Sequence, residues 1–61
     1  MMKVELIGGP FDGQTAEVAA DQTRLLRPAS VVNGGFVDMR SAEYHRQEDG
    51  SDVFEFVGFA R

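Results

Sequence analysis

Short runs that alternate apolar and polar residues, separated by turns rich in glycine, are the feature that most constrains how this chain folds. Such alternation is typical of a half-buried β-strand, because successive side chains of a strand point to opposite faces. We therefore predict an all-β fold, a single small domain over residues 1–61 built as a small antiparallel sheet or SH3-like barrel of five or six short strands. The strand-like runs are 3–7, 14–20, 31–32, 36–40, 44–47 and 53–57, and the turns are 8–13, 33–35 and 48–52.

The run 53–57 is the strongest strand in the sequence, since four of its five residues are valine or phenylalanine and both phenylalanines fall on one face. We expect it to be central in the sheet, with Phe54 and Phe56 buried. The run 44–47 also alternates but is polar, and this composition favours an edge strand.

Residues 15–27 are ambiguous between strand and helix. The first part of this stretch alternates as a strand would, and it would then form a hairpin with residues 3–7. Because the stretch also contains alanine, glutamate, glutamine and leucine, the alternative is an α+β fold with a short helix near residues 15–27. Pro28 is expected to end whichever element precedes it.

The chain has 61 residues and no cysteine, so neither disulfides nor thiolate metal sites hold its fold. With one histidine, a histidine-based metal site is not expected either, and we predict no metal and no cofactor. Domains of this size commonly gain stability by self-association. In the run 53–57, Val53 and Val57 lie opposite the two phenylalanines, so both faces are apolar and we predict a homo-oligomer, most simply a symmetric dimer.

The formal net charge is −4, and a phosphate backbone repels such a surface, so nucleic-acid binding is not expected. Residues 22–42 are basic and residues 43–55 are acidic, which favours a protein partner of complementary charge. No apolar run approaches the roughly 20 residues that cross a bilayer. Lys3 and Glu5 interrupt the apolar start, so we expect no signal peptide and a cytoplasmic protein, in the host cell if the protein is virus-encoded.

The loop Gly8–Gly13 is the most distinctive stretch, and two interpretations of it compete. Glycine-rich loops can bind phosphate through backbone amides, but a phosphate-binding loop needs a lysine and a following helix, which this stretch lacks. We therefore interpret it as a strand connection in which Gly9 and Gly13 adopt positive φ and Pro10 has a fixed φ. The Phe11 side chain would then insert from the loop into the core.

The sequence contains little from which to build a catalytic site. His45 is the only histidine, and it lies in a polar alternating run where an exposed strand position is expected. A deep pocket is also hard to build from 61 residues. We predict that the protein is not an enzyme and has no catalytic residues.

Lys3–Gln14 resembles the start of small uncharacterised proteins from actinobacteria and their phages, in which a Gly-Gly-Pro-x-Asp-Gly loop follows a short strand. Those proteins often close with a tyrosine-bearing hairpin, to which Tyr44–Arg46 and Phe54–Gly58 are similar. This resemblance implies a phage-encoded small protein that binds or antagonises a host protein. Separately, Gly9–Val18 is similar to the KOW motif of SH3-like barrels, which implies a small barrel and RNA or protein binding.

Three functions remain open from the sequence. The leading hypothesis is a non-catalytic interaction module with a protein partner and a homo-oligomeric state. A second is an oligomer that holds a small nucleotide-like ligand between glycine turns and arginines, and a third is a KOW-like nucleic-acid or ribosome-associated module. The residues predicted to form a binding loop or surface are Gly9, Pro10, Phe11, Asp12, Arg24, Arg27, Tyr44 and Phe59.

Overall fold

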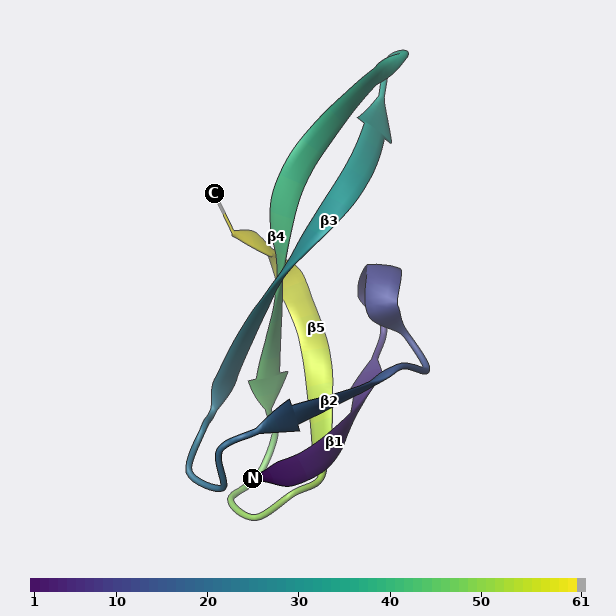
Figure 1. Ribbon diagram of the computed structural model, residues 1–61. Coiled ribbons are helices and arrows are strands. Elements are labelled where there is room, and N and C mark those ends of the chain that lie inside the picture. Colours follow the sequence, from purple (N-terminus) through teal and green to yellow (C-terminus); the bar gives the residue numbers. More distant parts are fainter. Residues whose placement is uncertain (61) are drawn as a thin grey trace.

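In the computed structural model, which describes residues 1–60 apart from the Asn33 side chain, the alternating runs form five strands of one sheet that curls almost into a barrel (Figure 1). The predicted all-β fold is confirmed. The alternative helix near residues 15–27 does not form, because two strands and a turn occupy that stretch. The elements are β1 (Met2–Ile7), a short 3-10 helix η1 (Gly9–Phe11), β2 (Thr15–Val18), β3 (Arg24–Asn33), β4 (Phe36–Arg46) and β5 (Val53–Ala60).

The strands have the spatial order β2-β1-β5-β4-β3, so β5 is central, as its composition predicts. Three neighbouring pairs are antiparallel but β1 and β5 are parallel, so the sheet is mixed rather than antiparallel throughout. β5 forms this parallel pair along the edge of β1 that β2 leaves open. Alternation within one strand carries no information on the direction of its neighbour, so it could not predict this pairing.

The core lies inside the curl of the sheet, and Tyr44 and Phe54 are its largest fully buried side chains. Phe56, which the alternation also predicts to be buried, is only partly buried. It lies at the rim of the core between the rings of Tyr44 and Phe59, at centroid distances of 5.4 and 5.2 Å. The buried residues are Val4, Leu6, Ala16, Val18, Ala29, Ala42, Tyr44 and Phe54.

Two predictions about β3 and β4 are wrong. Pro28 does not end an element but lies within β3, opposite Ser41 of β4. Since β3 is an edge strand, a proline is tolerated where its missing N–H would face away from the neighbouring strand. The stretch 44–46 is not at the edge, because it pairs with both β3 and β5. The polar residues around Tyr44 give this stretch the composition of an edge strand, although the strand is interior and Tyr44 is fully buried.

The β3–β4 hairpin projects from the curled sheet (Figure 1). Its two-residue turn has Gly34 and Gly35 at φ 58° and 86°, as a type I′ turn requires, so the tight turn predicted at 33–35 is confirmed. β5 pairs with β4 only from Ser41 onward. Residues 30–40, which we call the arm, are therefore a two-stranded ribbon with no third strand among the described residues, and the molecule is elongated, measuring 40 × 21 × 17 Å.

Candidate functional site

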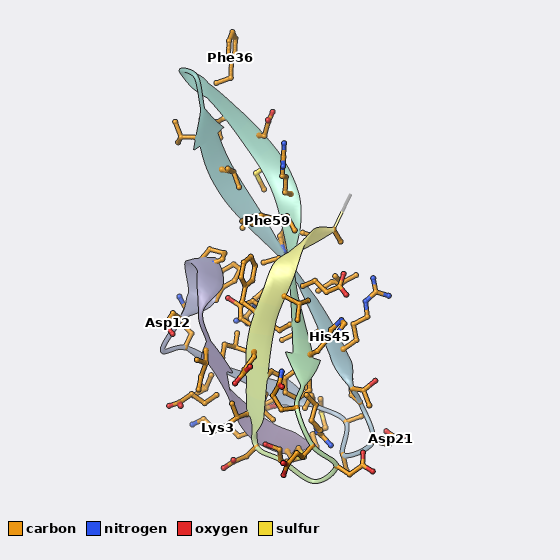
Figure 2. The ribbon with its side chains drawn as sticks, turned by 180° about the vertical axis from the view of Figure 1, so that it is seen from behind. Lys3, Asp12, Asp21, Phe36, His45 and Phe59 are labelled. Atoms are coloured by element: carbon orange, nitrogen blue, oxygen red, sulfur yellow. The ribbon has the colours of Figure 1, made fainter. Side chains whose placement is uncertain are left out.

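The arm exposes large apolar side chains that a layered sheet would bury. Val32, Phe36, Val37 and Met39 are 75%, 76%, 65% and 68% exposed, respectively. Figure 2 shows Phe36 at the far tip of the arm, pointing away from the rest of the molecule. Isolated two-stranded hairpins are at best marginally stable in water, and contiguous exposed apolar patches mark interaction sites. The arm is therefore the candidate functional surface.

The strand register divides these side chains between the two faces of the arm. Val32 lies directly opposite Val37, and the next pair on the same face is Ser30 with Met39. The Ser30 hydroxyl donates a hydrogen bond to Met39 Sδ at 3.2 Å. We call this the outer face, because it is opposite to the face that carries the buried Ala29. It is an uncharged strip dominated by apolar side chains.

The inner face of the arm continues the core side of the sheet and carries both apolar and charged groups. Phe36 is at its tip, followed by the pair of Val31 with Asp38 and the pair of Ala29 with Arg40. Arg40 and Asp38 form an ion pair of 3.9 Å on this face. An aromatic ring and a charge pair therefore lie side by side along β4.

The arm also has an open strand edge along β4. In a hairpin with a two-residue turn, the residues that flank the turn, here Asn33 and Phe36, form a hydrogen-bonded pair, and the pairs then alternate along the ribbon. Val37 and Met39 therefore direct their backbone N–H and C=O groups away from β3. No strand among residues 1–60 lies against β4 over 36–40 on that side. An edge of this kind can pair with a further strand.

The other edge of the hairpin, along β3, is interrupted at Pro28, which lies outside the arm. By the same alternation, Pro28 is one of the residues whose backbone faces away from β4. It has no N–H, so it interrupts the row of donors along that edge. Proline at an edge is one of the devices by which proteins oppose edge-to-edge association. Of the two edges, the one along β4 is free of such an interruption.

A hollow of about 360 Å³ lies beside β4, at the point where β5 stops pairing with it. Phe59 is close to this point along β5, is 39% exposed, and packs edge-on against the ring of Phe56. The hollow therefore borders Ala60, the last residue of β5. Its lining residues are Asp38, Met39, Arg40, Ser41 and Ala60.

The glycine loop is held together by its own hydrogen bonds. The Tyr44 hydroxyl donates to the Gly8 carbonyl at 2.7 Å and accepts from the Phe11 N–H at 3.1 Å. The Gly8 N–H in turn donates to Asp12 Oδ1 at 2.7 Å. Phe11 packs against the core, as predicted. The amides of Gly8 and Phe11, which a phosphate-binding loop would direct at its ligand, are thus already paired.

Gly9 and Gly13 have φ of 66° and 83°, so the positive φ predicted for both is confirmed. At Gly9 a Cβ atom would lie 2.5 Å from the Phe56 ring and 2.9 Å from the Tyr44 hydroxyl, whereas at Gly13 it would meet nothing within 4 Å. The loop therefore needs glycine at position 9 both for its backbone conformation and for the close approach of the sheet.

The structure divides the predicted surface residues into separate groups. Arg27 lies over the ring of Phe11, 5.4 Å from its centroid, and so belongs with the glycine loop. Arg24 is on the opposite face of β3, where its Nε lies 3.3 Å from Glu43 Oε2. The two arginines therefore do not face a common site. Gly9 and Phe11 lie against Tyr44, with Pro10 between them in η1. Arg27 lies over Phe11, Asp12 accepts from Gly8, and Phe59 is farther along the aromatic row.

Within the part of the chain that the structure describes, one cluster of titratable groups contains a carboxyl with a shifted pKa. It lies on the outer face of β4. His45 Nε2 hydrogen-bonds Glu43 Oε2, and Arg24 pairs with the same carboxylate. The hydrogen bond from His45 and the positive charge of Arg24 hold the pKa of Glu43 below its usual value, against partial desolvation. Through the pair of Arg24 with Glu43, the cluster links β3 to β4. Over residues 1–60 no three His, Cys, Asp or Glu side chains gather as a metal site would require.

Comparisons with known proteins add no relative. No family model, no curated protein and no solved structure matches the chain. Within residues 1–60, none of the helical structure has the length and apolar character needed to span a membrane.

Sequence reasoning missed the residues that the structure makes most prominent. Val32, Phe36, Val37 and Met39 were not among the predicted surface residues, because each fits the pattern of an ordinary half-buried strand. A signal was present in the alternation, which places Phe36 opposite to Val37 and Met39 and so makes both faces apolar. That signal becomes informative only once the hairpin is known to have no layer against either face.

Proposed function

We propose that the protein is a non-catalytic protein-binding module that contacts its partner through the arm. The observation that carries this proposal is the exposure of Val32, Phe36, Val37 and Met39 on a strand pair whose β4 edge is open. All four side chains are at least 65% exposed and lie on one projecting ribbon, and exposed apolar patches of this kind mark interaction sites.

The kind of contact follows from the two features together. An open edge binds an extended segment through main-chain hydrogen bonds, and neighbouring apolar side chains supply specificity and most of the buried area. The partner is therefore a protein that offers a strand with apolar side chains. If the chain is phage-encoded, as the resemblance of its glycine loop implies, a host protein is one source of such a strand.

The other two functions draw less support from the geometry. A nucleotide held between the glycine loop and the arginines would need Arg24 and Arg27 on one side, and they lie on opposite faces of β3. The loop amides at Gly8 and Phe11 are paired within the protein. For the KOW-like function, the net charge of −4 opposes contact with a phosphate backbone.

Site-specific photo-cross-linking tests the proposal. Phe36→p-benzoylphenylalanine places the probe at the tip of the arm, and Glu17→p-benzoylphenylalanine places it on an exposed position of β2 as a matched control. Irradiation in cells that produce each variant should yield protein adducts from position 36 and few from position 17. A folded variant at position 36 that gives no protein adduct, or adducts confined to position 17, would overturn the proposal.

A further inference from the structure

We infer that the Asp49–Gly50 peptide, in the turn between β4 and β5, is a site of spontaneous covalent modification at which Asp49 cyclises to a succinimide and reopens as isoaspartate. The chain contains Asp–Gly twice, at 12–13 and at 49–50. Glycine favours this reaction because no side chain shields its nitrogen. By sequence alone the two dipeptides are equivalent, and it is their surroundings in the fold that distinguish them.

The reaction needs only the two residues and water. The Gly50 nitrogen attacks the carboxyl carbon of Asp49, a C–N bond forms, and the carboxyl hydroxyl leaves as water with the proton from that nitrogen. Water then adds to one of the two ring carbonyls and breaks its C–N bond. Opening at the side-chain carbonyl restores aspartate, and opening at the main-chain carbonyl gives isoaspartate. The net change is an isomerisation that consumes no oxidant or reductant.

At Asp12–Gly13 the reacting groups are held by hydrogen bonds. The pair is the centre of a type II β-turn, with Asp12 at φ −52° and ψ 131° and Gly13 at φ 83°. This geometry directs the glycine nitrogen away from the aspartate side chain, so the peptide must rotate before the ring can close. Rotation breaks the 2.9 Å bond from the Gly13 N–H to the Leu6 carbonyl. Ring closure also takes the Asp12 carboxyl away from the Gly8 N–H, which donates to it at 2.7 Å.

The Asp49–Gly50 pair forms the same kind of turn without these restraints. The Ser51 N–H donates to the Glu48 carbonyl at 3.1 Å, and Gly50 has a φ of 76° while Asp49 has a negative φ, as in a type II turn. Both residues of the pair are exposed. Within residues 1–60, no hydrogen bond from the Gly50 N–H or to the Asp49 carboxylate corresponds to the two that hold the loop. The peptide is therefore free to rotate, and Asp49 is the reactive aspartate of the two.

The turn lies at the end of the molecule opposite to the arm (Figure 1). It leads into β5, the central strand of the sheet. Isoaspartate inserts one more carbon atom into the main chain, so it lengthens this turn and leaves the exposed apolar side chains of the arm untouched. The site is thus independent of the proposed function.

Site-resolved ageing of the purified protein tests the inference. Wild-type protein is incubated in native buffer and in urea and then digested, and isoaspartate at each position is measured by electron-transfer mass spectrometry. Methylation by an isoaspartyl carboxyl methyltransferase with labelled S-adenosylmethionine is an independent probe. In native buffer isoaspartate should accumulate roughly 10- to 100-fold faster at position 49 than at position 12, the factor expected when hydrogen bonds must break first. In urea the two rates should be similar, because those bonds are lost.

Two variants separate the site from its surroundings. Asp49→Glu would have to close a larger ring, so it should remove the isoaspartate signal of that peptide from the folded protein. Tyr44→Phe releases the glycine loop from its bonds to Gly8 and Phe11, so it should raise the native rate at position 12 and leave the rate at position 49 unchanged. Equal native rates at positions 12 and 49 in the wild type would overturn the inference. Isoaspartate at position 49 that forms in urea but not in native buffer would overturn it as well.

Discussion

At the scale of single residues, Tyr44 connects the glycine loop to the sheet. Its ring is fully buried and its hydroxyl bonds to both Gly8 and Phe11. Tyr44→Phe keeps the ring and removes both hydrogen bonds, which leaves partly buried backbone groups without these partners. We expect a loss of about 1–3 kcal/mol in the free energy of unfolding, measured by urea denaturation.

Thr15→Val is the control for this change, because it removes a hydroxyl from an exposed position of β2 and should leave the unfolding midpoint nearly unchanged. If Tyr44→Phe unfolds at the same urea concentration as the wild type, the hydroxyl does not hold the loop, and the packing of Phe11 must do so alone.

At the scale of elements, the loop that carries η1 is fitted against the sheet through Gly9. Gly9→Ala and Gly13→Ala each place a side chain on a backbone of positive φ, which costs about 1–2 kcal/mol. Only the added methyl at position 9 also collides with the Phe56 ring, so this variant should lose about 1–3 kcal/mol more in unfolding free energy. Thermal or urea unfolding of the two variants side by side measures the difference. Equal losses would mean that the loop can move off the sheet at little cost.

At the scale of the whole molecule, stability and interaction reside in different parts. The buried side chains lie inside the curl of the sheet, while Figure 2 shows Phe36 at the tip of the arm. Phe54→Ala should cost about 3–5 kcal/mol and leave so small a domain largely unfolded. Phe36→Ala should leave the unfolding of the monomer unchanged, measured by circular dichroism at concentrations where both proteins sediment as monomers. A comparable destabilisation by Phe36→Ala would show that the arm contributes to the core.

Local patterns in the sequence were sufficient for most of the strands and turns. Phe54 is buried as predicted, and in β1 the apolar Val4 and Leu6, which alternate with charged residues, are buried too. The turn at Gly34 and Gly35 forms where two adjacent glycines follow an asparagine. These features are local: alternation records which face of a strand is covered, and positive φ is a property of single glycines. The same reasoning identified the glycine loop as a connection whose phenylalanine packs against the core.

Only the tertiary structure decided which strands are neighbours and which faces remain uncovered. The parallel pairing of β1 with β5, the place of Pro28 within an edge strand and the partial burial of Phe56 all depend on contacts between distant segments. The candidate surface is the clearest case, because Phe36 and Val37 have the same sequence pattern as residues that are buried elsewhere in the chain. The sequence by itself determined that these residues form two strands joined by a tight turn. Whether a layer of the protein covers that ribbon is a property of the whole packing, since burial depends on what lies against a strand and not on the strand itself.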